Sequence, residues 1–141
     1  MATWEDVRAV ALALPETLER EGRGGLRDWR VKDGARDKGF VWERPLRKSD
    51  LAALGNTAPS GLILGARVSD VGAKEALIAD DPGVYFTTPH FDGYPAILVQ
   101  LDHIDVTELA ELVVEAWLVQ APKKLAAEYL KSRDAEDGAA G

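Results

Sequence analysis

The sequence predicts one α+β domain, in which an antiparallel sheet of about five strands packs against an N-terminal helix and C-terminal helices. Apolar residues recur at helical spacing near both ends of the chain, and short apolar or alternating runs separated by turn residues fill the middle. The 141 residues contain no internal repeat and no long linker, so we expect a single domain over residues 1–131. Residues 132–141 are small and polar, and we expect them to form a flexible tail.

Capping residues and apolar periodicity mark the helices. Thr3 is a good N-cap for the first helix, and Pro15 stops it. Four further helices are expected to begin at Ser49, Ser69, Thr107 and Pro122. The predicted helices cover residues 4–14, 50–54, 70–79, 108–120 and 122–130.

Five segments have the composition of strands. The first two form a hairpin across a polar loop, 33–38; Trp29 and Val31 alternate in one strand, Phe40 and Trp42 in the other. The third segment is apolar enough for a central position in the sheet. The predicted strands cover residues 26–32, 39–43, 61–68, 84–87 and 96–101.

The four tryptophans stand at apolar-periodic positions, and we expect each to be mostly buried. Trp29 and Trp42 stand at corresponding positions in the two strands of the predicted hairpin, and such rings can also stack with nucleic-acid bases. Alternation along a half-buried strand is more typical of core residues, so the core interpretation is favoured. The residues concerned are Trp4, Trp29, Trp42 and Trp117.

Positive charge is concentrated between Arg20 and Lys48. This segment has ten Lys or Arg and five Asp or Glu, a local net charge of +5 in a chain of −7, so the rest sums to −12. Clustered cations bind phosphates, but a solvated hairpin with charged edges is the favoured interpretation, and the overall acidity opposes DNA at long range. The candidate DNA-binding residues are Arg27, Arg30, Lys32, Arg36, Lys38 and Arg44.

The composition excludes several kinds of chemistry. The absence of cysteine excludes disulfides, thiolate catalysis and cysteine-based metal sites. His90 and His103 lack a metal-site spacing, and the chain has no P-loop, nucleophile elbow or dinucleotide fingerprint. We therefore predict a protein that is not an enzyme and has no metal and no cofactor. No run approaches the ~20 apolar residues of a membrane helix and the N-terminal segment contains acids, so we expect a cytoplasmic protein without a membrane partner.

Aromatic and hydroxyl side chains are concentrated in residues 85–95, YFTTPHFDGYP, where two prolines and a glycine restrict the backbone. If this loop is extended, Thr88, His90 and Asp92 share a face, and a histidine beside a carboxylate has the composition of a general base. A loop histidine that bonds backbone groups is commoner, so recognition is favoured over catalysis. The candidate pocket residues are Thr88, His90, Phe91, Asp92 and Tyr94.

Three strings give the chain a resemblance to a known family. Residues 40–46 (FVWERPL), 85–95, and EAW at 115–117 followed by Ala121-Pro122 resemble the MmcQ/YjbR family, and the resemblance covers about residues 3–130. It implies a compact bacterial α+β protein with a double-wing arrangement of β-hairpins, and a DNA-binding description that rests on the fold alone. It supplies no catalytic residue for this chain.

Two functions remain as hypotheses. The first is weak, non-specific binding of DNA or another polyanion by the basic hairpin, since no helix rich in Arg, Asn or Gln is available to read bases. The second is recognition of a small molecule or a protein by the loop 87–95. Added salt weakens phosphate binding steeply, whereas it has little effect on the burial of apolar surface. The salt dependence of binding therefore distinguishes the two hypotheses. The sequence leaves the oligomeric state open.

Overall fold

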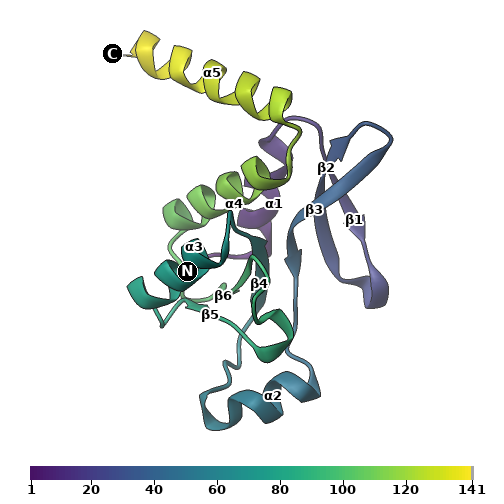
Figure 1. The fold of residues 1–141 in the computed structure, drawn as a ribbon, viewed down its shortest axis with the longest axis vertical. Helices are drawn as coiled ribbons and strands as arrows, with labels where there is room; N and C mark the ends of the chain where they lie inside the picture. The colour runs from purple at the N-terminus through teal and green to yellow at the C-terminus, as the bar shows by residue number, and fades with distance from the viewer. Residues whose placement is uncertain (141) are drawn as a thin grey trace.

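Six strands form one antiparallel sheet in the order β1-β2-β3-β4-β6-β5 (Figure 1). The computed structural model describes residues 1–140, with side chains through Ala135. The α+β class and the antiparallel sheet are confirmed, with one strand more than expected. The strands are β1 (Thr17–Glu21), β2 (Arg27–Asp33), β3 (Arg36–Glu43), β4 (Ile63–Arg67), β5 (Tyr85–Phe86) and β6 (Ala96–Gln100).

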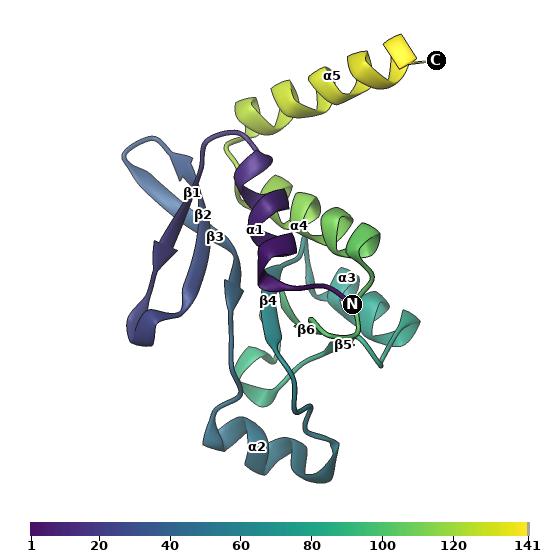
Figure 2. The same cartoon turned by 180° about the vertical axis from the view of Figure 1, so that it is seen from behind.

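Helices cover one face of this sheet. α1 and α4 pack against each other as predicted, α1 beside β1 and α4 over β3 and β4, whereas α5 leads away from the body of the protein (Figures 1 and 2). α5 contacts the core through Tyr129, whose ring centroid lies 5.0 Å from that of Trp117. Within residues 1–140 the helices are α1 (Trp4–Ala13), α2 (Lys48–Leu54), α3 (Val71–Asp80), α4 (Val106–Gln120) and α5 (Lys123–Ala140), with short 3-10 turns at Arg23–Gly25, Gly55–Thr57 and Pro89–Phe91.

The main core lies between α1, α4 and the sheet, and two tryptophans are at its centre. Trp29 and Trp117 are fully buried, as predicted. Trp4 is partly exposed and stacks on Trp29 at 6.3 Å between ring centroids. Trp42 is also partly exposed, but it packs on the opposite face of the sheet with Ile63 and Leu98. None of the four is mainly exposed, while Trp42 lies outside the main core.

β1 is the strand that the sequence analysis missed. It pairs with β2 from Thr17↔Val31 to Glu21↔Arg27 and forms one edge of the sheet. Its sequence, TLERE, has one apolar residue, so the alternation that marks a half-buried strand is missing. Charge on an edge strand protects it from pairing with other chains, which explains a strand of this composition at this place.

A β-bulge in β3 reverses the predicted phase of the hairpin. Trp29 pairs with Val41 and Arg30 with Gly39, so Phe40 is the extra residue of the bulge. Phe40 and Val41 are both buried in the main core, and Trp42 consequently faces the other side. The expectation that Phe40 and Trp42 share a face was therefore wrong. Gly39, a glycine inside a strand, is the sequence signal for such a bulge.

The hairpin turn is shorter than predicted. β2 and β3 pair as far as Asp33↔Arg36, which leaves Gly34 and Ala35 as the turn. Gly34 has φ 63, in the left-handed region that two-residue hairpin turns require. The polar loop predicted over 33–38 was wrong, because its charged residues belong to the strands.

Several helix boundaries differ from those predicted. Asp70 rather than Ser69 caps α3, because its carboxylate accepts a hydrogen bond from Ala73 N at 2.7 Å. α5 continues past Leu130 to Ala140; the flexibility of 132–141 stays a prediction, and Gly141 lies outside the described residues. No helix within residues 1–140 combines the length and the apolar character needed to cross a membrane. α2 begins at Lys48 and α4 at Val106, each before the predicted caps Ser49 and Thr107.

Candidate functional site

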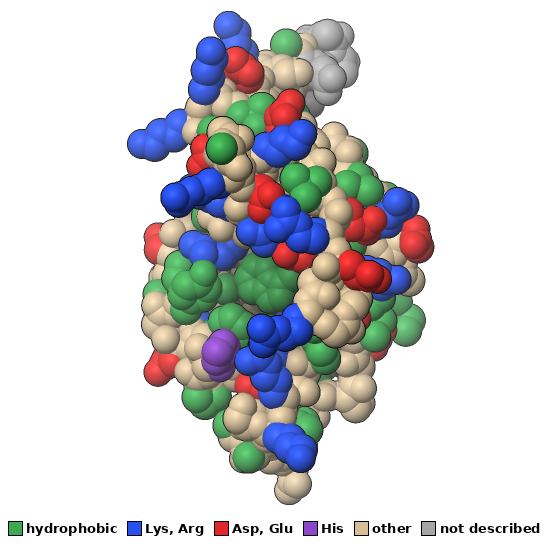
Figure 3. Space-filling model, turned by 90° about the vertical axis from the view of Figure 1, so that its right-hand side faces the viewer, with side chains coloured by type: hydrophobic (Ala, Val, Ile, Leu, Met, Phe, Trp, Pro, Cys, Tyr) green, Lys and Arg blue, Asp and Glu red, His purple; other side chains and the backbone are tan. Residues whose placement is uncertain are grey.

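The sheet face opposite the main core is hollowed into an open groove of about 960 Å³. The β2–β3 hairpin borders it on one side, and the loop 89–94 borders it on the other. Figure 3 shows an apolar hollow at the centre of one face of the protein, with Lys and Arg side chains gathered around it. The basic hairpin and the aromatic loop, expected to be alternative sites, thus share one groove. Its volume lies in the range of ligand pockets, roughly 300–1,000 Å³.

Trp42 forms the floor of the groove, and Gly65 makes room for it. A Cβ atom added to Gly65 in the neighbouring strand would lie 2.5 Å from Nε1 and 2.8 Å from Cζ2 of the indole. The ring therefore rests directly on the β4 backbone, and Trp42 remains partly exposed to the groove. Gly39 plays the same role under Asp28 and Arg30, since its added Cβ would lie 3.2 Å from Asp28 Oδ1.

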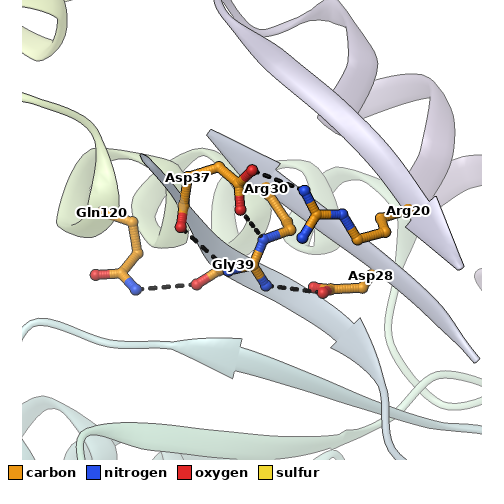
Figure 4. A network of polar contacts seen from close by, with 6 residues as sticks. All are labelled: Arg20, Asp28, Arg30, Asp37, Gly39 and Gln120. Atoms are coloured by element: carbon orange, nitrogen blue, oxygen red, sulfur yellow. Dashed lines mark hydrogen bonds and ion pairs between the residues drawn. The ribbon is translucent and has the colours of Figure 1, made fainter. Parts of the chain in front are cut away.

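A network of ion pairs fills the hairpin end of the groove (Figure 4). Arg30 donates to both Asp28, at 2.8 Å, and Asp37, which also accepts from Arg20 at 2.8 Å. Burial lowers the pKa of Arg30, but its bonds to Asp37 and Asp28 outweigh this and raise it above the ordinary value. The bond from Arg30 holds the pKa of Asp37 below its ordinary value. Gln120 of α4 closes this end by donating to Gly39 O at 2.9 Å.

The aromatic loop forms a 3-10 turn at Pro89–Phe91 and is not extended. The expectation that Thr88, His90 and Asp92 share a face does not fit this geometry, since Thr88 is 2% exposed and does not line the groove. His90, Phe91, Asp92 and Tyr94 do line it. Within the described residues no hydrogen bond joins His90 to Asp92, and the His90 ring stands edge-on to Phe91 at 4.9 Å.

A buried lysine holds the aromatic loop in place. Lys74 of α3 is 4% exposed, and its Nζ donates to Phe91 O at 2.6 Å and Tyr94 O at 3.2 Å. Burial lowers the pKa of Lys74, and the charge of nearby Asp92 opposes this shift. Lys74 does not line the groove, so it positions the loop from beneath.

Replacing Lys74 by methionine is expected to loosen the loop. The carbonyls of Phe91 and Tyr94 each lose the bond from a charged donor and keep one from a backbone N–H, and a hydrogen bond to a charged group contributes about 1.5–3 kcal/mol. Amide hydrogen exchange of Asp92, Tyr94 and Ala96 should accelerate roughly tenfold or more. Lys48→Met, at an exposed position, should leave these rates unchanged. Equal rates in the Lys74 variant and the unmodified protein would show that other contacts hold the loop.

A second buried cation ties the end of β3 to α2. Arg44 is 5% exposed; its Nη1 lies 3.0 Å from Asp50 Oδ2 and donates to Pro45 O at 2.6 Å. The guanidinium lies 5.3 Å from the centre of the Phe91 ring. Arg44 therefore connects three segments around the groove, and its main role is structural.

The six candidate cations of the basic hairpin do not form one free cationic surface. Arg30, Lys38 and Arg44 line the groove but are paired with carboxylates. Arg27 lies over the Trp4 ring at 5.8 Å, toward α1, and also lines the groove. This distribution over both sheet faces weighs against a hairpin that binds phosphates along its length. The remaining two, Lys32 and Arg36, are exposed and lie outside the groove.

Three other arginines line the groove without an ion pair within the described residues, as do two carboxylates, those of Glu43 and Asp92. Arg23, Arg47 and Arg67 line it and make no ion pair with any described carboxylate. Arg67 is fixed by Tyr94, since its Nη1 donates to the hydroxyl at 2.6 Å and its guanidinium lies 4.9 Å from the ring centre. None of the three is among the candidate site residues predicted from the sequence. Arg67 ends an apolar strand far along the chain from the hairpin, and no local pattern relates the two.

The fold and the groove describe a compact α+β protein with a ligand-sized hollow on one sheet face. The YjbR family model matches residues 12–119, and the chain therefore belongs to the YjbR family, which confirms the resemblance. Uncharacterized proteins of Mycobacterium tuberculosis and Mycobacterium bovis are each 57% identical over 133 residues, which is 92% of this chain and 97% of theirs.

The fold is also similar to the crystal structure of a Deinococcus radiodurans protein with a DUF419 domain. The TM-score is 0.64 at 20% identity, over 84% of this chain and 78% of that one. At this identity the similarity shows the fold alone.

Proposed function

We propose that this protein is a binding protein that holds an anionic ligand in the groove without catalysing a reaction. The set of unpaired arginines Arg23, Arg47 and Arg67 is the observation that supports this most strongly. Cations whose charge is not already compensated attract an anion, and a planar guanidinium donates paired hydrogen bonds to phosphate or carboxylate. The ordered loop beside them reduces the entropy lost on binding.

Recognition fits the loop better than catalysis. His90 lines the groove, and its ring makes no hydrogen bond to a described residue, whereas the tautomer of a histidine base is usually fixed by a carboxylate or a backbone carbonyl. Lys74, the buried amine nearby, is occupied by two loop carbonyls. These contacts support a site that is built to hold a ligand.

Nucleic acid is the second candidate ligand, and the openness of the groove favours it. A strand that follows the groove passes Arg23 and Lys38 of the hairpin side and Arg47 near α2. Three of the six hairpin cations are paired, and the chain carries a net charge of −7, so such binding is proposed to be weak and without sequence specificity. The predicted cytoplasmic location stays a prediction.

Anion binding is tested with two variants of equal charge change. Pyrophosphate at low salt should shift the amide NMR signals of groove residues, and Arg23→Gln with Arg47→Gln should weaken its binding roughly tenfold or more. Lys32→Gln with Arg36→Gln removes two cations outside the groove and should change affinity by about twofold at most. Equal effects of the two pairs, or signal shifts confined to the hairpin tip, would contradict the proposal.

Chain length separates a small ligand from a polyanion. Affinity for single-stranded oligothymidylates should stop rising once the strand fills the groove if the ligand is small. For a polyanion, affinity keeps rising with length, and its salt dependence steepens by about 0.7 per added phosphate contact. Fluorescence anisotropy over a series of lengths and salt concentrations measures both quantities.

A further inference from the structure

We infer that the groove binds a planar aromatic ring that stacks on Trp42 and carries an anionic group held by Arg47 and Arg67. This inference rests on the proposed function and names the ligand class. The shared chemistry is an aromatic ring with an amino group on its edge, joined to a phosphate or carboxylate. A nucleotide has this form, whether it is free or part of a strand.

The orientation of Trp42 supports the stacking. The indole lies on Gly65 with nothing between the ring and the β4 backbone, since even a methyl group there would overlap it. One face of the ring is therefore covered by the sheet, and the partly exposed side chain contributes its free surface to the groove. A flat aromatic surface at the floor of a groove is the arrangement on which bases and other planar rings stack.

The charge distribution orients the ligand. At the hairpin end, Arg30 is neutralised by Asp28 and Asp37 and is not free to pair with a phosphate, so on this side only Arg23 and Arg27 line the groove without an ion pair to a described carboxylate. At the opposite side, Arg67 is held over Tyr94 and has no carboxylate partner among the described residues. The anionic group consequently belongs on the side of the aromatic loop and α2, with the ring over Trp42.

The hairpin end also selects the edge of the ring. Asp28 Oδ2 accepts from Arg30, while Asp28 Oδ1 lies above Gly39, where a side chain is missing. A carboxylate oxygen has more than one lone pair, so Oδ1 can accept from a ligand. A ring edge with an amino group complements this oxygen, and an edge with a carbonyl is repelled by it.

The inference is tested by calorimetric titration with adenosine 5′-monophosphate and ribose 5-phosphate as probes. Adenosine monophosphate should bind about five- to hundredfold more tightly than ribose 5-phosphate, the contribution of one stacked base. Equal affinities would overturn the stacking inference and leave anion binding intact. If neither phosphate binds, the proposed function itself fails.

Variants at the floor test the role of Trp42. Trp42→Leu should abolish the advantage of adenosine monophosphate over ribose 5-phosphate and leave binding of the latter unchanged. Gly65→Ala should do the same with the tryptophan present, because the new Cβ displaces the indole. Trp4→Leu, which removes a partly exposed indole from the opposite sheet face, is the matched control and should retain the advantage. Equal loss of both ligands in Trp42→Leu, with thermal unfolding unchanged, would assign Trp42 a structural role only.

Two further titrations test which edge of the ring faces Asp28 and whether the ligand is a free nucleotide or a strand. Inosine monophosphate, which has a carbonyl in place of the amino group, should bind more weakly than adenosine monophosphate, and equal binding would overturn the assignment to Asp28. A free nucleotide is the ligand if adenosine monophosphate binds as tightly per molecule as an oligoadenylate. A strand is the ligand if the oligoadenylate binds more tightly at equal nucleotide concentration. Both outcomes keep the stacking inference, which fails if neither adenine ligand protects the Trp42 fluorescence from acrylamide quenching.

Discussion

Replacing Asp50 by alanine is expected to lower the free energy of unfolding by about 3–5 kcal/mol, the usual cost of removing one partner of a buried ion pair. Asp50 is 2% exposed, and it accepts from the Arg47 backbone N at 2.8 Å besides pairing with Arg44. Without the carboxylate, the Arg44 guanidinium is buried beside Phe91 with its charge uncompensated. Urea unfolding followed by tryptophan fluorescence measures the loss.

Two controls define this result. Ser49→Ala, at the exposed neighbouring position, should change stability by about 0.5 kcal/mol at most. The double variant Arg44→Met with Asp50→Ala should recover part of the loss, because no unpaired charge is then buried. A loss of about 1 kcal/mol or less for Asp50→Ala would mean that the pair acts like an exposed one.

The contribution of Asp50 should depend on pH in a defined direction. Burial raises the pKa of Asp50, but the Arg47 N–H and the Arg44 guanidinium outweigh it and hold the pKa below the ordinary 3.8. A carboxyl group whose pKa is lower in the folded state stabilises the fold above its unfolded pKa, and this stabilisation is lost as the pH falls through the folded value. The stability difference between the unmodified protein and Asp50→Ala should thus be constant near neutral pH and shrink below pH 3.8.

Trp117→Ala is expected to destabilise the protein by about 3–5 kcal/mol, the range for emptying a large aromatic site in a core. Trp117 is fully buried, its Nε1 donates to Pro15 O at 3.2 Å, and its ring contacts Tyr129 of α5. The substitution therefore removes core volume and also the hydrogen bond that ties α4 to the end of α1.

Chemical unfolding of a pair of variants measures this effect. Trp117→Phe keeps an aromatic ring and should lose less stability than Trp117→Ala, and Leu51→Ala, at an exposed position, should lose about 0.5 kcal/mol at most. A cost below about 1 kcal/mol for Trp117→Ala would show that the space it occupies collapses without penalty.

The helices and central strands could be predicted because burial imposes a period on the sequence. Trp29 and Val31 alternate, Trp117 follows the helical repeat of α4, and each is buried as that period requires. β1 could not be recognised in this way, because an edge strand is solvated on most sides and no apolar period is needed.

The two walls of the groove were predicted as alternative sites for a physical reason. Its walls come from the hairpin and from a loop about fifty residues later, and only the pairing of β3 with β4 and β4 with β6 brings them together. The bulge at Phe40 then turns Trp42 toward this groove, an outcome set by tertiary packing of Phe40 and Val41 in the core. The sequence also could not show which cations are free, because Arg30 and Arg44 acquire their carboxylate partners only when the chain folds.

The contact of Trp42 with Gly65 links the evolution of two positions that are twenty-three places apart in the chain. Because a Cβ at position 65 would overlap the indole, an aromatic residue at 42 and any side chain at 65 exclude each other on this backbone. Among family members that retain this groove, the two positions should therefore change together: a larger residue at 65 should be accompanied by a smaller one at 42. Such paired substitutions would mark the branches of the family in which the floor of the groove, and with it the choice of ligand, has been rebuilt.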